Sequence, residues 1–271
     1  MEIIKPSVEL WNQGEDWEAH VAKCARVCYG SNKTTQNEEL INGLIKSNHI
    51  SMFRHRTAYF IGRYDDVTNT IIQAYHGHIG FDYCCSGLDT YIVVNGNWML
   101  DNIDSYNMIA KYQVTEEEFS NTQIGFNMMR YTFKVVTQIS TSRELNRVSP
   151  NNISERSTRY VTENGIICEP HWFNNTNLLS YEYIKQEYLY SCEESFRQYE
   201  KLIQNKFPKE DARGVLPLDT ATTCVYTYSV QEWRHIIDLR YYGKTGKPHP
   251  NVKIIAGLIK DKLNDLGYDF D

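Results

Sequence analysis

The sequence predicts a mixed fold of helices and strands, of the α/β or α+β class. Some segments carry apolar residues at helical spacing, and others are rich in β-branched and aromatic residues. The two kinds of segment are interspersed, but without the strand–helix–strand rhythm of a parallel nucleotide-binding sheet. No internal repeat and no low-complexity linker divides the chain, so we expect a single domain over residues 1–271.

Apolar residues at helical spacing predict five helices along the chain. They cover residues 15–29, 36–47, 178–204, 231–240 and 252–267. The last helix should end at Gly267, because glycine is favoured just past a helix C-terminus. The acidic run Glu116–Glu118 indicates the start of one more short helix.

Strand propensity predicts β-strands around residues 58–61, 91–94 and 131–137. Residues 220–229 are either a strand or the start of a buried helix. The region 62–130 contains many turn signals and is expected to be the least regular part of the chain, with a tight turn at Asn95-Gly96.

The charge balance limits the partners that the protein can have. Its 28 Lys and Arg residues are outnumbered by 34 Asp and Glu, which gives a formal net charge of -6. This balance disfavours nucleic acid as a partner, because nucleic-acid binding needs a basic surface. A small anionic ligand remains possible, since a few arginines in one cleft can hold a phosphate group.

The sequence also predicts a soluble, cytoplasmic protein without a membrane partner. No apolar run approaches the roughly 18 residues that span a bilayer, and the N-terminus lacks the pattern of a signal peptide. The odd number of 7 cysteines fits a reducing compartment better than a disulfide framework. No metal site is expected, because the chain has no C-x-x-C pair and His76-Gly77-His78 lacks a third ligand at regular spacing.

Three polar segments containing arginine are candidates for an anion site. They are the run Glu155-Arg156-Ser157-Thr158-Arg159-Tyr160, the segment 212–217 with Arg213, and the segment 232–240 with Arg240. Hydroxyl groups beside guanidinium groups suit the binding of phosphate. Chemistry alone favours a less specific interpretation, namely solvated polar turns and a cation at a helix end.

In their order and spacing, these segments resemble the flavin-dependent thymidylate synthase family. The central stretch of that family reads approximately S-H-[QE]-x-x-R-H-R-x-x-S-x-x-x-x-S-x-R-Y, and residues 142–160 follow it without a gap. The family motifs A-R-x-x-L-P and L-R match Ala212–Pro217 and Leu239-Arg240. Residues 25–29 and 48–55 resemble two further blocks, A-R-x-x-[YFW] and G-H-x-[ST]-x-x-E-H, whereas residues 56–130 look like an insertion within the domain.

The resemblance implies a central sheet flanked by long helices and an enzyme that methylates C5 of dUMP to give dTMP. Methylenetetrahydrofolate would supply the one-carbon unit, and FAD reduced by NADPH would supply the electrons. Arg240 would act catalytically, by stabilising negative charge that develops on the pyrimidine. The residues at the dUMP-binding positions are Glu144, Glu155, Ser157, Thr158, Arg159, Arg213 and Arg240. The family forms homotetramers with active sites shared between subunits, and the resemblance implies the same assembly here.

On the flavin side the sequence departs from the family pattern. The R-H-R motif is replaced by Arg147-Val148-Ser149, which lacks a histidine and an arginine, and Arg54 replaces a family glutamate. The dUMP site is therefore preserved, while the cofactor site is remodelled. The residues at the FAD-binding positions are His49, Ser51, Arg147, Ser229, Gln231 and His235.

Three hypotheses follow for the function. The first is a flavin-dependent thymidylate synthase. The second is a diverged paralogue that transfers another one-carbon group to C5 of a pyrimidine nucleotide. The third is a non-catalytic nucleotide-binding subunit that has lost flavin. Flavin content and the mass of the product distinguish the three.

Overall fold

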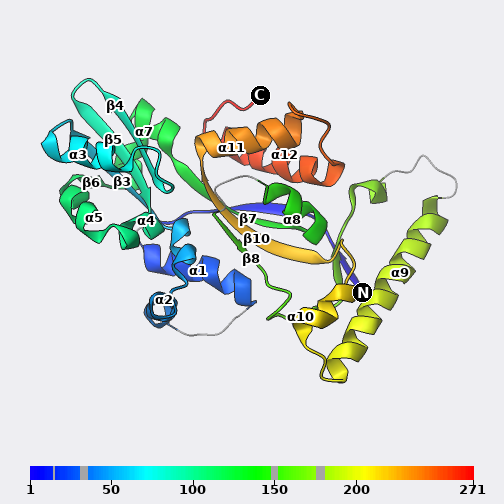
Figure 1. Ribbon diagram of the computed structural model, residues 1–271. Coiled ribbons are helices and arrows are strands. Elements are labelled where there is room, and N and C mark those ends of the chain that lie inside the picture. The colour runs from blue at the N-terminus through cyan, green and yellow to red at the C-terminus, as the bar shows by residue number, and fades with distance from the viewer. Residues whose placement is uncertain (15, 31–35, 148–151, 175–180) are drawn as a thin grey trace.

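The computed structural model describes all residues except 15, 31–35, 148–151 and 175–180. Among the described residues, two antiparallel sheets of four strands and one parallel pair of strands are combined with helices (Figure 1). The mixed α/β class is therefore confirmed. The parallel pair joins β1 (Glu2–Ile4) to β9 (Ile166–Cys168).

The main sheet lies at the centre of the fold, and all of its strands are antiparallel. Its order is β2 (Ser7–Trp11), β7 (Arg130–Gln138), β10 (Ala221–Ser229) and β8 (Ile153–Glu155). Strands β7 and β10 pair along their whole length, from Ala221 opposite Gln138 to Ser229 opposite Arg130. The strand at 131–137 is confirmed, and residues 220–229 are a strand rather than the start of a helix.

Helices cover both faces of the main sheet (Figure 1). Alternate residues of β10 point to opposite faces, as in any β-strand: Tyr226 and Tyr228 belong to the core under α11 and α12, and Val225 packs against Cys24 of α1. The bounds of these helices are α1 (Trp17–Tyr29), α8 (Ile139–Leu145), α11 (Val230–Ile237), the π-helix η5 (Asp238–Tyr242) and α12 (Pro250–Asp265).

The region 56–130 is a second folded layer, and the expectation of irregular structure there is wrong. Its sheet has the order β4 (Phe81–Ser86), β5 (Asp89–Asn95), β3 (Thr57–Arg63) and β6 (Gln113–Val114). The helices of this region are α3 (Asp66–Tyr75), α4 (Gly96–Asp101), α5 (Ile103–Ile109), η2 (Ala110–Tyr112), α6 (Glu116–Ser120) and α7 (Gln123–Met128). The short helix predicted at Glu116 is confirmed.

The turn predicted at Asn95-Gly96 is also wrong, because Asn95 caps helix α4. Its side chain accepts a hydrogen bond from the backbone N–H of Trp98 at 2.9 Å. The same residue types favour turns and helix N-caps, so the sequence signal was ambiguous. One face of the second sheet has its own apolar core around Phe60 and Val94, and the other face contributes Tyr59 to the core of the main sheet.

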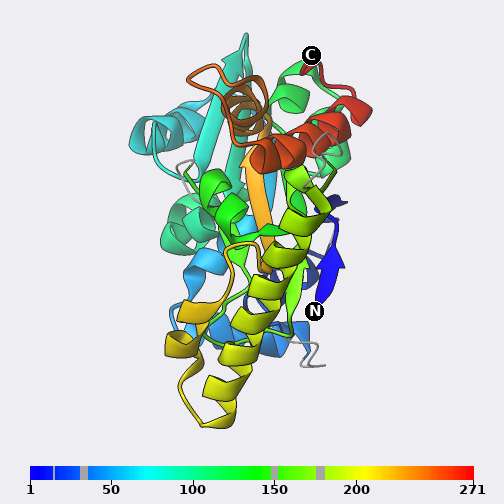
Figure 2. The same cartoon turned by 90° about the vertical axis from the view of Figure 1, so that its right-hand side faces the viewer.

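Among the remaining elements, α9 and α10 lie at the lower right of Figure 1 and α2 lies at the lower left. Helix α9 lies on the face of the molecule turned toward the viewer in Figure 2 and packs Cys192 and Phe196 against Phe173. No helix in the described ranges is long and apolar enough to cross a membrane. The bounds are α2 (Asn37–Lys46), η1 (Ile50–His55), η3 (His171–Asn174), α9 (Tyr181–Gln204), α10 (Lys209–Ala212) and η4 (Arg213–Val215).

A buried chain of hydrogen bonds ties η1 and α1 to the main sheet. The two ring nitrogens of His55 contact Thr227 Oγ1 and Ser154 Oγ, each at 2.8 Å. Thr132 Oγ1 lies 2.7 Å from Thr227 Oγ1 and 3.2 Å from His20 Nε2. Burial lowers the pKa of His55 to about 3 and that of His20 to about 4. Both rings are therefore neutral at pH 7, and each can donate one hydrogen bond and accept another.

We expect the free energy of unfolding to fall as the pH is lowered from 6.5 to 5. Both histidines have a pKa in the folded state that lies below the ordinary value. The unfolded state therefore binds more protons than the folded state between pH 6.5 and 5. The stability that is present above pH 6.5 is lost as the pH falls through this window. Each contributes a slope of up to about 1.4 kcal/mol per pH unit. Urea unfolding at a series of pH values measures the slope. His55→Gln should reduce it, and the same change at exposed His235 should not; equal slopes in the two variants would contradict the assignment.

Candidate functional site

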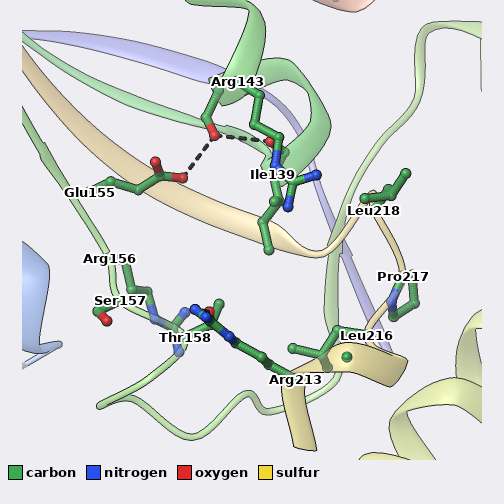
Figure 3. A pocket seen from close by; sticks show the side chains of 12 residues that line it. Ile139, Arg143, Glu155, Arg156, Ser157, Thr158, Arg213, Leu216, Pro217 and Leu218 are labelled. Carbon is green, nitrogen blue, oxygen red and sulfur yellow. Dashed lines mark hydrogen bonds between the residues drawn. The ribbon is translucent and has the colours of Figure 1, made fainter. Parts of the chain in front are cut away.

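A cavity of about 550 Å³ opens at one end of the main sheet, where three distant parts of the chain meet (Figure 3). Its polar lining consists of Ser142, Arg143, Glu155, Arg156, Ser157, Thr158 and Arg213. Its apolar lining includes Ile139, Leu216, Pro217 and Leu218. Figure 3 shows Arg143 and Glu155 on one side of the cavity and Arg156, Thr158 and Arg213 on the other.

The antiparallel pairing of the main sheet creates this convergence. Because β7 ends where β10 begins, α8 starts beside the segment 216–218 that leads into β10. Strand β8 pairs with the same part of β10, with Glu155 opposite Cys224, and so adds residues 155–158 to the site. Arg213 comes from η4, the short helix before this segment.

Glu155 is held in place by three donors. Its carboxylate accepts hydrogen bonds from Ser142 Oγ at 2.8 Å, Asn146 Nδ2 at 3.2 Å and Thr222 Oγ1 at 3.3 Å. The amide oxygen of Asn146 in turn accepts from the hydroxyl of Tyr226 at 2.9 Å. A carboxylate with this many donors has a fixed orientation at the edge of the cavity.

The opposite side of the cavity is rich in donors. Arg213 donates through Nη1 to Thr158 Oγ1 at 3.1 Å and through Nε to the carbonyl of Glu210 at 3.0 Å. The backbone N–H of Ser157 donates to the carbonyl of Cys28 at 3.0 Å, which ties this turn to the end of α1. Guanidinium and hydroxyl groups placed together in this way suit a phosphate group.

The cysteines near the cavity are poor nucleophiles. Burial raises the pKa of the Cys28 thiol, and it raises that of Cys224 well above the ordinary value. Both are therefore protonated at neutral pH, whereas attack on a substrate requires the thiolate. The cavity thus supports binding through charge and hydrogen bonds rather than covalent attack by cysteine.

Arg159 is not among the residues that line the cavity, although its backbone N–H donates to the hydroxyl of the lining residue Ser157 at 3.3 Å. Its guanidinium forms an ion pair with Glu210, with Nη2 to Oε2 at 3.1 Å, and both side chains are 52% exposed. Exposed pairs of this kind contribute only about 0–1 kcal/mol. The predicted contact between Arg159 and a phosphate would therefore need a rotation of its side chain.

Arg240 and Glu144 form a second group, outside the set of residues that line the cavity. Arg240 lies in the π-helix η5, and its Nη1 is 3.5 Å from Glu144 Oε2 on α8. Its Nε is buried and has no hydrogen-bond partner among the described residues. π-Helical turns are rare in proteins, and those that occur are often found at functional sites.

The predicted flavin residues are dispersed over one chain. Ser229 and Gln231 line another cavity, of about 350 Å³, at the far end of β10. The eight residue steps along β10 place its two ends about 27 Å apart. The others are exposed on three different elements: His235 on α11, His49 and Ser51 at η1, and Arg147 after α8. Val148 and Ser149, where the sequence departs from R-H-R, lie outside the described residues.

The chemistry of these residues suits FAD. A guanidinium, two imidazoles and an amide are suitable donors for a diphosphate and a flavin ring, and they are exposed. Ser229, by contrast, is committed to capping α11, since its Oγ accepts from the backbone N–H of Glu232 at 3.2 Å. The length of β10 separates Ser229 and Gln231 from the first cavity of the same chain.

The described residues contain no group of three or more His, Cys, Asp and Glu side chains that could hold a metal ion. His76 and His78 are exposed at the end of α3 and in the turn after it.

Three polar residues of the cavity lining were absent from the predicted set, namely Ser142, Arg143 and Arg156. Arg143 stands where the family pattern has histidine, so the resemblance gave no reason to include it. Arg156 follows Glu155 directly, and its presence in the lining depends on how the chain leaves β8. The concentration of arginine in residues 143–159 was the available signal.

A comparison with protein-family models identifies the family. The model described as thymidylate synthase complementing protein matches residues 120–265, which is more than half of the chain. The protein therefore belongs to this family, and the resemblance found in its motifs is confirmed. The match covers α8, β8 with the turn after it, η4 and η5, which carry all the residues predicted to bind dUMP or act on it.

A curated relative and two solved structures are similar to this chain. A probable flavin-dependent thymidylate synthase from Paramecium bursaria Chlorella virus 1 is 37% identical over 65 residues, which are 24% of this chain and 29% of the relative. The chain thus spans less than a third of that relative's length. The UMP/dUMP methylase PolB from Streptomyces cacaoi, bound with 5-Br dUMP, has a TM-score of 0.51 at 18% identity over 98% of this chain and 93% of its own. Its structure with 5-Br UMP has the same score, and at this identity the likeness establishes the fold.

We expect Glu155→Ala to lower the free energy of unfolding by about 1–3 kcal/mol, because Ser142, Asn146 and Thr222 would lose their acceptor. Chemical denaturation measures the change. The control is Glu200→Ala on the exposed side of α9, which should change the stability by less than about 0.5 kcal/mol. If the two variants are equally stable, the Glu155 network carries no stability.

Proposed function

We propose that the protein is a flavin-dependent thymidylate synthase, which transfers a methyl group to C5 of dUMP. The observation that carries the proposal is the cavity itself: the residues that line its donor-rich side, Ser157, Thr158 and Arg213, are those at the dUMP-binding positions of the family motifs. The ligands bound in the two similar structures, 5-Br dUMP and 5-Br UMP, support a pyrimidine nucleotide as substrate.

In this proposal the phosphate binds beside Arg213, Thr158 and Ser157, and the sugar lies along the apolar wall around Leu218. Glu155 accepts hydrogen bonds at the other side of the cavity. FAD reduced by NADPH would supply the electrons, and methylenetetrahydrofolate would supply the carbon. The seven cysteines are free, as expected in the reducing cytoplasm where we propose that the enzyme works.

We further propose that the active site is shared between subunits of a homotetramer. Arg240 and Glu144 lie outside the residues that line the nucleotide cavity, and Ser229 and Gln231 lie at the opposite end of β10. A second copy can bring its Arg240 to the pyrimidine and its flavin-binding residues to the nucleotide. There the guanidinium would stabilise negative charge that develops on the ring.

A second candidate function is methylation of UMP as well as dUMP. It is favoured by the fold likeness to a UMP/dUMP methylase and by the departures from the R-H-R motif. Both candidates use the same cavity, and they differ in whether the ribose 2′-hydroxyl is tolerated.

Reconstitution of the purified protein tests the proposal. The protein is mixed with FAD, NADPH, methylenetetrahydrofolate and either dUMP or UMP, and the nucleotide product is identified by mass. Methylation of dUMP supports the proposal, and methylation of both nucleotides supports the second candidate. Another added group indicates a diverged one-carbon transferase. Binding of dUMP without any product, by a protein that takes up no flavin, indicates the non-catalytic subunit.

We expect Arg213→Ala to weaken the binding of dUMP by about 1.5–3 kcal/mol, the usual contribution of hydrogen bonds to a charged group. Isothermal titration calorimetry measures the effect. The matched control is Arg197→Ala, which removes an exposed arginine paired with Glu194 on α9. Equal affinity in the Arg213 and Arg197 variants would contradict the placement of the phosphate.

Sharing of the site predicts that two inactive variants complement each other. Arg213→Ala and Arg240→Ala should each abolish most activity, but mixed and reassembled in equal amounts they should form intact sites from two different chains. Random assembly restores about a quarter of the wild-type activity. If the mixture stays as inactive as its components, Arg213 and Arg240 act within one chain.

A further inference from the structure

Arg156 occupies the place in the cavity that the resemblance assigned to Arg159. It lines the cavity together with Arg213 and Thr158, and Figure 3 shows its guanidinium on their side of the space. Arg159, three residues later, is not among the lining residues and pairs with Glu210. Arg156 therefore already lines the cavity, whereas Arg159 does not.

A buried carboxylate fixes the orientation of Arg156. Its Nη2 lies 3.3 Å from Glu163 Oε2 and donates to the carbonyl of Thr162 at 3.3 Å. The Glu163 side chain is only 4% exposed, whereas that of Arg156 is 21% exposed. Within the described residues both contacts use Nη2, which leaves Nε and Nη1 available to a ligand.

The surrounding backbone is fixed as well. The N–H of Arg156 donates to the carbonyl of Thr223 on β10 at 2.8 Å, and the N–H of Glu163 donates to the hydroxyl of Tyr199 on α9 at 3.4 Å. Tyr199 is fully buried. Arg156 is thus held between the main sheet and α9, so its side chain loses little conformational freedom when a ligand binds.

The charge arrangement also favours an anion. Two guanidinium groups on one side of a cavity repel each other, and Glu163 compensates Arg156 from behind rather than from inside the cavity. The carboxylate that lines the cavity, Glu155, lies on the opposite side, away from these two guanidiniums. A phosphate dianion is the chemical group that matches two guanidiniums and two hydroxyls.

We propose that Arg156 binds the phosphate of the nucleotide, with Glu163 as the residue that positions it, and that Arg156 rather than Arg159 completes the phosphate site with Arg213. This inference rests on the proposed function, because it assumes a nucleotide in this cavity.

The test compares the Glu163→Gln variant with the double variant Arg156→Gln/Glu163→Gln. Removing Arg156 alone would leave the buried charge of Glu163 without a partner and could prevent folding, whereas both of these variants lack that charge. We expect the dissociation constant for dUMP to be about ten- to a hundredfold higher in the double variant than in Glu163→Gln. For uncharged deoxyuridine, followed by ligand-observed NMR, the two variants should agree within about threefold, because the lost contact is to phosphate.

Two further variants separate the possible failures. If wild-type protein does not bind dUMP, or Arg213→Gln binds it equally well, the proposed nucleotide site is wrong. If Arg213→Gln loses affinity but the double variant matches Glu163→Gln, only the assignment of Arg156 is overturned. The same conclusion follows if Arg159→Gln weakens the binding of dUMP more than the double variant does. It also follows if the double variant loses as much affinity for deoxyuridine as it loses for dUMP.

Discussion

The antiparallel pairing of β7 with β10 is the constraint on which the rest of the structure depends. It brings the end of one strand to the start of the other, so that α8, the turn after β8 and the segment before β10 meet at one cavity. The same pairing sends Ser229 and Gln231 to the opposite end of the sheet. A strand is stiff, so no side-chain rotation can bring the two groups together. Their separation is the physical reason for proposing a site shared between chains.

Three of the arginines assigned to the proposed site have a carboxylate partner that lies outside the cavity lining. Arg156 pairs with Glu163, Arg159 with Glu210 and Arg240 with Glu144. These pairs limit the repulsion between like charges while leaving donors available. They also differ in strength, because the Glu163 carboxylate is buried and Glu210 is exposed. A buried partner fixes an arginine before the ligand binds, and an exposed partner lets its arginine move.

The sequence predicted well those features that depend on local pattern. Helical spacing located α1, α2, α9, α11 and α12 to within a few residues, and strand propensity located β7. The strands predicted at 58–61 and 91–94 correspond to β3 and β5, but the region 62–130 was misjudged as the least regular part of the chain. Its many turn signals lie between short elements and do not exclude a folded sheet. Asn95 shows the same limit, since one residue type serves both turns and helix caps.

The motifs located the cavity but not every residue in it. The family pattern fixed the positions of Glu155, Ser157 and Arg213 along the chain, and the structure brings these three together. It could not show that Arg156 rather than Arg159 lines the cavity, because this depends on a buried carboxylate several residues later and on packing against α9. Nor could the spacing show that the flavin positions lie on separate elements.

The central claim is that this cavity binds a pyrimidine nucleotide next to a flavin. The visible absorption spectrum of the purified protein, recorded with added FAD and then with added dUMP, tests it most directly. The account predicts a protein-bound flavin spectrum that changes when dUMP is added, because the two ligands would be in contact. A protein that retains no flavin, or a bound flavin whose spectrum is insensitive to dUMP, would contradict it.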